Sequence, residues 1–444
     1  MWVRPERWAI PIILSIALAL MAGCSTRGAP STEPTVSTPA ASSAETAAQA
    51  PAAPAATPFS GPLVLSMWVP DFMGTVSTQP GGAILDGLLT EFAEAQEEPL
   101  RVQTQVKTRY GKGGLLDYLR SAYPIAPGIL PDIVALDAAE LEQAVAAGAV
   151  QPLDGVIGED VLAGLYPAAR QMGQIEGRQY AVPYALDIEQ VVYDPGVTES
   201  APETWTGLLT GDTRYLIPLS IPAVRSGPAA GVPPALLSHY LGGGHTLDPQ
   251  TRQLSLESEP LLRMLNFYDQ AEEQGQLDER PEELSGLHEA RQFYEADTDA
   301  LIQSSARQLA SERELNQDLA FAAAPGWSSS SPAVATGWVL AVVTPDPERQ
   351  KRAVELLTWL LAAEHNGRWT EAAGWLPVSP AGWDAWEAGP YREFLEEQLA
   401  LAAPLPTGSD SAAAALALQE AAIAVVRDGV SPLDAAREAL TPSQ

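Results

Sequence analysis

The sequence predicts an α/β fold with two lobes, each built on a doubly wound sheet that helices flank. Three observations predict it. Residues 61–444 form a longer stretch than one hydrophobic core usually accommodates. Short apolar segments with strand-like alternation are followed, repeatedly, by amphipathic segments of helical spacing. Segments rich in Gly, Ser and Pro separate them, as expected for the connections of a sheet with parallel strands.

The elements of the first lobe can be assigned in order. "PLVLSMWV" (62–69) is an apolar strand, and residues 70–82 are rich in Gly, Ser and Thr, as in a loop. The following segment places Ile84, Leu88, Leu89 and Phe92 on one helical face. A strand is then expected at 100–108, a helix at 113–123, and a strand at 133–136 that leads into a helix ended by Gly148. We therefore expect β, α, β, α, β, α.

Polar and aromatic side chains follow the ends of these strands. They are Trp68, Asp71, Tyr110 and Asp137. Ligands of doubly wound sheets bind outside the carboxyl ends of the strands, so these four residues are candidate ligand contacts. Structural roles are the alternative: Trp68 could be a core aromatic residue, and Asp137 could cap a helix.

The segment "GRQYAVPYALDIEQVVYDPGV" (177–197) reads as buried strand at both ends and is polar in the middle. Pro183 has no amide hydrogen and disfavours helical conformation just before it, so we expect the strand to be interrupted there. A strand that ends at a cleft and restarts would leave Tyr184 and Asp187 facing a ligand. The alternative is that Tyr184 simply packs beneath the cleft.

The first 60 residues predict export and a tether. Arg4 and Arg7 precede an apolar run that is too short for a membrane span, so residues 1–23 are expected to be a signal peptide. "LMAGCS" resembles the bacterial lipoprotein signal, and this resemblance implies that Cys24, the single cysteine, is lipidated. The alternative is an ordinary cleaved signal with a chance cysteine. Residues 24–60 are mostly Ala, Pro, Ser and Thr, the composition of a disordered tether.

The charge balance is strongly acidic. The formal net charge is −31, and the only lysines are Lys107, Lys112 and Lys351. Such a surface repels nucleic acid and anionic lipid headgroups, so no nucleic-acid partner is expected. It also disfavours strongly anionic ligands, unless local arginines override it.

Several segments, taken in order, carry a family resemblance. "LPDIVALDAAELEQAVAAGAVQPLD", the 177–197 segment, "TGWVLAVVTPDPERQKRAVELLTWLL" and "GWLPVSP" resemble the extracellular solute-binding proteins of carbohydrate ABC importers, of the maltodextrin-binding type. The matches cover nearly all of 63–440. The resemblance implies the two-lobed periplasmic-binding-protein fold of type II. Its lobes would be discontinuous, one of 61–181 plus 333–366 and the other of 182–332 plus 367–444, with the first crossover at Pro183.

The resemblance also implies a cleft between the lobes. Sugar rings offer apolar faces and a rim of hydroxyls, which suit aromatic planes and carboxylates respectively. Aromatic rings with faces open to the cleft are therefore expected, together with carboxylates that accept hydrogen bonds from sugar hydroxyls. The expected ligand contacts are Trp68, Asp71, Tyr110, Asp137, Tyr184, Asp187, Trp327, Trp338 and Trp375. Trp205 and Trp359 lie in helical patterns and are expected in the core.

The implied function is that of a substrate-binding lipoprotein. It would capture a small solute, a sugar or oligosaccharide, by hinge closure and deliver it to ABC permease subunits as a monomer, anchored by lipid to the outer face of the cytoplasmic membrane. No enzyme motif is found, and no cofactor or metal is expected, although His239 and His245 flank "YLGGG". Alternatives are a surface glycan hydrolase and a ligand-sensing subunit for a receptor kinase. Basic solutes such as polyamines also remain open.

Overall fold

A computed structural model describes residues 62–74, 80–219, 232–248, 251–279, 300–311 and 318–441. These residues belong to one compact unit, Ser60–Gln444. The predicted signal peptide, Cys24 and the tether lie outside the described residues.

Ten strands of the described chain form one mixed sheet in the order β2-β1-β3-β11-β6-β9-β7-β8, with β10 paired to β6 and β12 paired to β11. The strands are β1 (Leu63–Val69), β2 (Leu100–Val106), β3 (Ile133–Asp137), β6 (Ala181–Tyr193), β7 (Arg214–Ile217), β8 (Leu277–Glu279), β9 (Ala300–Ser305), β10 (Ala320–Ala322), β11 (Val334–Val342) and β12 (Ala403–Pro404). A separate hairpin is formed by β4 (Gln174–Ile175) and β5 (Arg178–Gln179).

Helices surround the sheet. The helices of the first half and of the crossover region are α1 (Pro80–Glu94), α2 (Leu115–Ala122), α3 (Leu141–Ala146), α4 (Glu159–Ala163), α5 (Pro167–Met172), α11 (Pro347–Leu361), α12 (Ala363–Ala373) and α13 (Pro390–Leu401). Those of the second half are α6 (Trp205–Leu209), α7 (Pro234–Gly242), α8 (Ser258–Glu273), α10 (Ala306–Ser311), α14 (Ser409–Asp428) and α15 (Pro432–Ala439). Short 3₁₀ turns are η1 (Asp71–Met73), η2 (Pro127–Ile129), η3 (Ala138–Glu140) and η5 (Pro380–Ala385).

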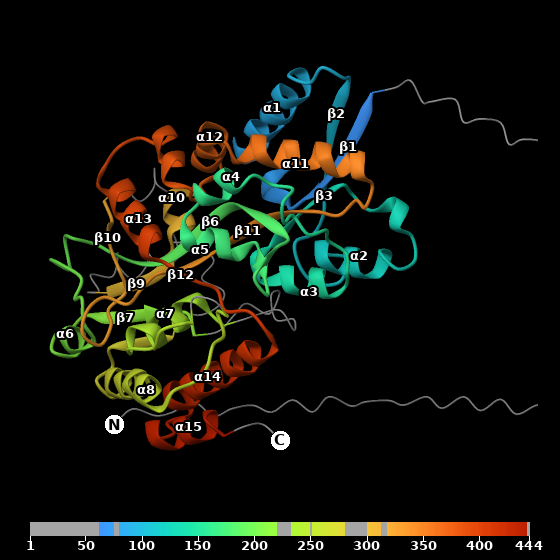
Figure 1. Cartoon of the computed structure of the whole chain (residues 1–444). Helices are drawn as coiled ribbons and strands as arrows, with labels where there is room; N and C mark the ends of the chain where they lie inside the picture. The colour runs from blue at the N-terminus through green and yellow to red at the C-terminus, as the bar shows by residue number, and fades with distance from the viewer. Residues whose placement is uncertain are drawn as a thin grey trace, which may run out of the picture. The chain divides into compact units, whose positions relative to one another are not determined.

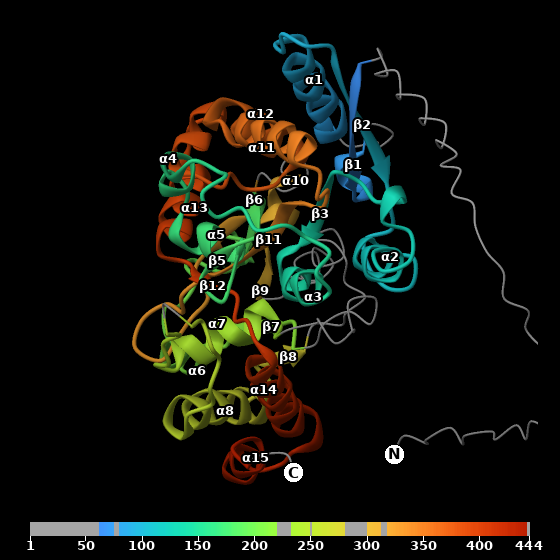
Figure 2. The same cartoon turned by 45° about the vertical axis from the view of Figure 1, so that its right-hand side comes forward.

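The first half of the sheet has the predicted doubly wound arrangement. Strand β1 pairs in parallel with both β2 and β3. Because crossovers between parallel strands are right-handed, α1 and α2 must cover opposite faces of these strands. Figures 1 and 2 show α1 and α11 on one side of β1–β3 and α2 and α3 on the other. The predicted order of strands and helices in 62–148 is confirmed.

The second half repeats the parallel pattern. Strand β7 pairs in parallel with both β8 and β9. Helices α8, α14 and α15 pack against one another beside this half (Figure 2). Although α14 is long and apolar enough to span a membrane, this packing is that of a helix in a folded domain.

Strand β6 connects the two halves, because its first part pairs with β11 and its last part pairs with β9 and β10. The expected interruption at Pro183 was wrong, since β6 runs unbroken from Ala181 to Tyr193. Consecutive residues of β11, Trp338 and Val339, face Ala185 and Pro183, so Tyr184 is the extra residue of a β-bulge. A bulge accommodates the missing proline amide without ending the strand.

The buried side chains form two hydrophobic cores. The larger core takes its residues from β1, β3, β11, most of β6 and the helices α1, α11, α12 and α13. The smaller core is formed around α7, α8, α14 and β7. Trp369, Trp383 and Leu395, from the region 367–399, pack in the larger core. Two cores joined by one long strand fit the predicted two-lobed architecture.

Candidate functional site

The carboxyl ends of strands from both halves meet at one place in the sheet. Strands β1, β2 and β3 are parallel and end at the same edge, which positions η1, the segment 107–110 and Asp137 together. Strand β11 lies between β3 and β6 (Figure 1). Its register places Trp338 opposite Asp137 and Thr336 opposite Asp187. The backbone register alone therefore brings Asp137, Trp338 and Asp187 into one neighbourhood.

Aromatic side chains gather at this junction. The ring of Phe72 lies edge-on to Trp338, with centroids 5.2 Å apart, and is tilted against Trp375 at 4.9 Å. Tyr110 lies 6.1 Å from Trp338. Trp375 reaches the junction because the next residue, Leu376, exchanges two backbone hydrogen bonds with Leu186 of β6. We refer to Phe72, Tyr110, Trp338 and Trp375 as the aromatic cluster.

Three predicted carboxylates border the aromatic cluster, and each is hydrogen-bonded within the protein. Asp71 accepts two hydrogen bonds from Arg109, at 2.5 and 3.0 Å. These bonds hold the pKa of the Asp71 carboxyl below its ordinary value. Asp137 accepts from the Tyr110 hydroxyl at 2.6 Å, and also caps η3 by accepting from the Ala139 amide at 3.0 Å. The structural role considered for Asp137 thus coexists with a place at the site.

Asp187 is the carboxylate contributed by β6. It accepts from the Ser305 hydroxyl at 2.5 Å and from the backbone amides of Arg307 and Ile188 at 2.9 and 3.0 Å. Burial raises the pKa of the Asp187 carboxyl, while the Arg307 guanidinium, 3.9 Å away, acts in the opposite direction. Asp187 therefore ties the start of α10 to β6.

Cationic side chains cover ring faces here, including those of two tryptophans that the sequence predicted to be open, Trp68 and Trp375. Arg109 lies over Phe72 with its guanidinium carbon 5.2 Å from the ring centroid, and Arg307 lies over Trp375 at 4.9 Å. The Lys107 ammonium lies 4.7 Å from the centroid of Trp68. Trp68, Trp338 and Trp375 are 4%, 3% and 6% exposed. The expectation of open ring faces was wrong for this state of the molecule.

Three predicted aromatic contacts lie outside the aromatic cluster, and the first is Trp68, whose ring lies edge-on to Tyr118 of α2 with centroids 6.0 Å apart. Tyr184 is fully buried and packs against Trp369 at 4.5 Å, the structural role considered for it. Trp327 is 48% exposed, lies edge-on to Trp205 and carries Arg263 over its ring, beside α6 and α8. Trp205 is buried, as predicted, stacked on Phe267.

Four residues of the site were not predicted: Phe72, Lys107, Arg109 and Arg307. For Lys107 and Arg109 a signal existed, because "VKTRYGKGG" is a basic stretch within a very acidic chain. It follows β2 directly, where side chains at the carboxyl edge of a sheet meet ligands.

Gly337 allows β11 to approach β6 at the site. Its φ of +155° disfavours other residues, and a Cβ atom there would lie 1.9 Å from the carbonyl oxygen of Ala185. Only glycine lets the two strands pair closely at this point, next to Trp338.

His239, which precedes "YLGGG", has both ring nitrogens in a buried hydrogen-bonded chain. Its Nδ1 lies 2.7 Å from the Tyr268 hydroxyl and its Nε2 lies 2.8 Å from the Tyr215 hydroxyl. Tyr215 donates to Gln303 Oε1 at 2.6 Å, so its oxygen accepts from Nε2–H and Tyr268 donates to Nδ1. Burial lowers the pKa of His239 to about 3, so the ring is neutral at physiological pH.

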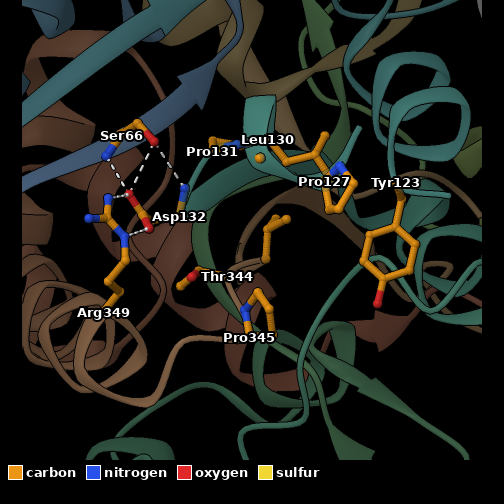
Figure 3. Close-up of a pocket in the computed structure, with 11 residues that line it drawn as sticks. Ser66, Tyr123, Pro127, Leu130, Pro131, Asp132, Thr344, Pro345 and Arg349 are labelled. Atoms are coloured by element: carbon orange, nitrogen blue, oxygen red, sulfur yellow. Dashed lines mark hydrogen bonds and ion pairs between the residues drawn. The ribbon is translucent and has the colours of Figure 1, made fainter. Parts of the chain in front are cut away.

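A cavity of about 650 Å³ lies at the opposite, amino-terminal edge of β1 and β3. Figure 3 shows Ser66, Asp132 and Arg349 on one side of it and Tyr123 and Pro127 on the other. The polar groups bond one another: Arg349 donates to both Asp132 oxygens at 2.6 Å, and the Ser66 amide donates to Asp132 at 2.7 Å. These bonds fasten α11 to β1 and β3. The cavity is thus separate from the aromatic cluster.

Comparison with known proteins gives the family of the chain and relatives of its fold. The sequence pattern described as bacterial extracellular solute-binding protein matches residues 119–382, more than half of the chain. The chain belongs to the bacterial extracellular solute-binding protein family. The matched region includes Asp137, Asp187, Trp338 and Trp375 of the site.

Solved structures share the fold of this solute-binding protein at low identity. The cyclic alpha-maltosyl-1,6-maltose binding protein from Arthrobacter globiformis superposes with a TM-score of 0.68 at 18% identity, covering 86% of this chain and 98% of its own. The sugar-binding protein of the phytopathogen Xanthomonas citri gives 0.67 at 16% identity, covering 85% and 95%. A maltotriose-binding protein from Pyrococcus abyssi is 23% identical over 163 residues, 35% of this chain and about a third (34%) of the relative's length.

Proposed function

We propose that this protein is the solute-binding subunit of an ABC importer and that it captures a sugar or oligosaccharide at the aromatic cluster. The observation that carries the proposal is the meeting of Phe72, Tyr110, Trp338 and Trp375 at the carboxyl edges of strands from both halves of the sheet. Aromatic planes suit the apolar faces of sugar rings. The relatives named above, which bind maltotriose and other sugars, support the same ligand class.

We propose that capture occurs by hinge closure between one lobe of 61–181 plus 333–366 and another of 182–332 plus 367–444. With these boundaries, Phe72 belongs to the first lobe and Trp375 to the second, and in this structure both rings are buried together in the larger core. A sugar can reach either ring only when the lobes part. It then stabilises the closed form by contacting both sides.

The carboxylates support a binding role rather than hydrolysis. A glycosidase needs one carboxyl group as an acid and another as a base or nucleophile. Here Asp71, Asp137 and Asp187 are each occupied by hydrogen bonds within the protein, which suits them to holding arginine and tyrosine side chains in place.

We further propose that the protein is exported, lipidated at Cys24, and held at the outer face of the cytoplasmic membrane beside its permease. Membership of an extracellular family supports export. The position of Cys24 behind the apolar run, and the composition of residues 24–60, support the anchor and the tether.

Titration calorimetry on truncated tryptophans tests the binding site, after a thermal-shift screen of sugars, polyols, amino acids and polyamines has found a ligand. Trp338→Ala and Trp375→Ala should each weaken binding about 30- to 150-fold, because a lost stacking face forfeits ~2–3 kcal/mol. Trp359→Ala is the matched control. This residue packs against Phe92 on α1 with centroids 6.1 Å apart, so its truncation should lower the melting temperature and leave affinity unchanged.

Trp327→Ala forms a second arm of the same experiment. Unchanged affinity in this variant is expected, because Trp327 lies beside Trp205 and Arg263 rather than in the aromatic cluster. A loss confined to Trp327→Ala would place the ligand elsewhere and overturn the proposed site. A screen in which polyamines bind and sugars do not would overturn the proposed ligand class.

A further inference from the structure

The hydrogen-bonding capacity around the aromatic cluster is unevenly divided between acceptors and donors. All six oxygens of Asp71, Asp137 and Asp187 already accept a hydrogen bond from the protein. Neutral sugar hydroxyls both donate and accept, and are best matched by a site with unoccupied groups of both kinds. Each of these carboxylate oxygens is therefore engaged by the protein, with at most part of its accepting capacity left for a ligand.

Two donors at the site have no hydrogen-bond acceptor among the described residues, the Lys107 ammonium and the Trp375 indole, and Arg307 has only an ion pair. The Lys107 ammonium makes no hydrogen bond and no ion pair with a described residue, and only the faces of Trp68 and Tyr118 lie against it, at 4.7 and 5.2 Å. The Arg307 guanidinium makes no hydrogen bond with a described residue and lies 3.9 Å from Asp187. The indole N–H of Trp375 is buried and has no acceptor among the described residues. A buried donor left without an acceptor is costly, so a ligand that accepts here is favoured.

The segment that follows β2 is basic, although the chain as a whole is strongly acidic. Among 444 residues there are 56 acidic and 25 basic side chains, yet Lys107, Arg109 and Lys112 fall within six consecutive positions after β2. Arg109 projects onto Phe72 of the aromatic cluster, and Lys107 projects onto Trp68. Arg109 is neutralised by Asp71, whereas Lys107 has no carboxylate partner within the described residues. An unpaired cation in so acidic a protein is available for an anionic ligand.

We propose that the ligand is an acidic oligosaccharide and that Lys107 binds the carboxylate of one of its sugar units. This inference rests on the proposed sugar-binding function and specifies its substrate class. A carboxylate is an acceptor only, so it matches the excess of donors without requiring an acceptor from the protein. Trp68 and Tyr118, on which Lys107 lies, form one wall of this subsite.

The experiment compares matched pairs of probes by titration calorimetry. One pair is maltotriose and maltotriose oxidised to carboxylates at C6, and the other is galactotriose and trigalacturonate. The acidic member of at least one pair should bind at least tenfold more tightly than its neutral partner. Lys107→Gln should weaken the binding of that acidic probe by about 10- to 100-fold, the scale of a charge-assisted hydrogen bond, and should change the neutral probe less than threefold.

Two further variants serve as controls. Lys107→Arg keeps the charge over Trp68 and should retain most of the affinity, which separates a charge effect from damage to the fold. Lys351→Gln makes the same change of net charge on the exposed surface of α11 and should leave the binding of both probes unchanged.

The outcomes distinguish this inference from the function on which it rests. Neutral probes that bind as tightly as acidic ones, or an acidic probe that Lys107→Gln does not weaken, would overturn the acidic-ligand inference and leave sugar binding intact. If no member of either pair binds, both the inference and the proposed sugar-binding function are rejected.

Discussion

His239 should make the stability of this protein depend on pH in a way that one substitution removes. The ring is buried and neutral, with its pKa lowered to about 3 from the ordinary value of 6.5. Its contribution to stability is therefore fully present above pH 6.5. Below pH 6.5 the unfolded chain takes up a proton that the folded protein refuses, so stability is lost as the pH falls from 6.5 towards 3.

The size of this effect follows from the two pKa values. Each pH unit within the window costs about 1.4 kcal/mol, and between pH 7.5 and 5.0 the His239 term falls by ~2 kcal/mol. His239→Gln keeps a donor and an acceptor near Tyr215 and Tyr268 but cannot titrate. The variant can be less stable at every pH, but its stability should fall less steeply in acid.

Urea unfolding at a series of pH values, followed by tryptophan fluorescence, measures the difference. The acidic side chains titrate in both proteins and cancel when the variant's curve is subtracted from the wild-type curve. The difference between the wild-type and variant free energies of unfolding should fall by ~2 kcal/mol between pH 7.5 and 5.0. If this difference changes by less than ~0.5 kcal/mol, the two curves of unfolding free energy against pH are parallel, which would refute the conclusion that His239 stays neutral in the folded protein.

Three further predictions concern the scaffold and the anchor. Asp132→Asn should lower the free energy of unfolding by about 1.5–3 kcal/mol, because it weakens the charged hydrogen bonds between buried Asp132 and partly exposed Arg349. Solute affinity should not change in a titration, and a parallel loss of affinity would link that cavity to the site. Gly337→Ala should lower the free energy of unfolding by about 2–3 kcal/mol, because its Cβ would meet the Ala185 carbonyl oxygen. Gly87→Ala, which has open space around it in α1, is the control and should raise this free energy by up to ~1 kcal/mol. Equal effects of the two substitutions would contradict the close approach of β11 to β6 at Gly337. Cys24→Ser should move the protein from the membrane fraction to the soluble fraction, and continued membrane association would rule out lipidation at Cys24.

Local sequence patterns predicted the parts of the fold that depend on neighbouring residues. The strands and helices of 62–148 follow from alternation and helical spacing, and the candidate residues Asp71, Tyr110 and Asp137 follow from their position after strand ends. The β-bulge at Tyr184 was not predicted, because it depends on pairing with a strand about 150 residues away. The general expectation that proline interrupts a strand uses only the neighbouring residues, so it could not account for the pairing with β11.

The composition of the site was harder to predict than its location. Covered ring faces depend on where Lys107, Arg109 and Arg307 project, and sequence spacing does not determine this. The acidic balance of the whole chain also gave no sign of the basic stretch beside the proposed ligand site. Charge averaged over 444 residues says little about the potential inside a cleft.

The position of β11 between β3 and β6 has a consequence for synthesis and export. Its residues, Val334–Val342, leave the ribosome long after those of the two strands that it joins. Until then β3 and β6 each present an unpaired edge, and such edges recruit other chains. A chain truncated before Val334 should therefore aggregate rather than fold as a smaller domain. Partly made copies of this protein depend on chaperones, or on threading through the export machinery, to remain unpaired until β11 arrives.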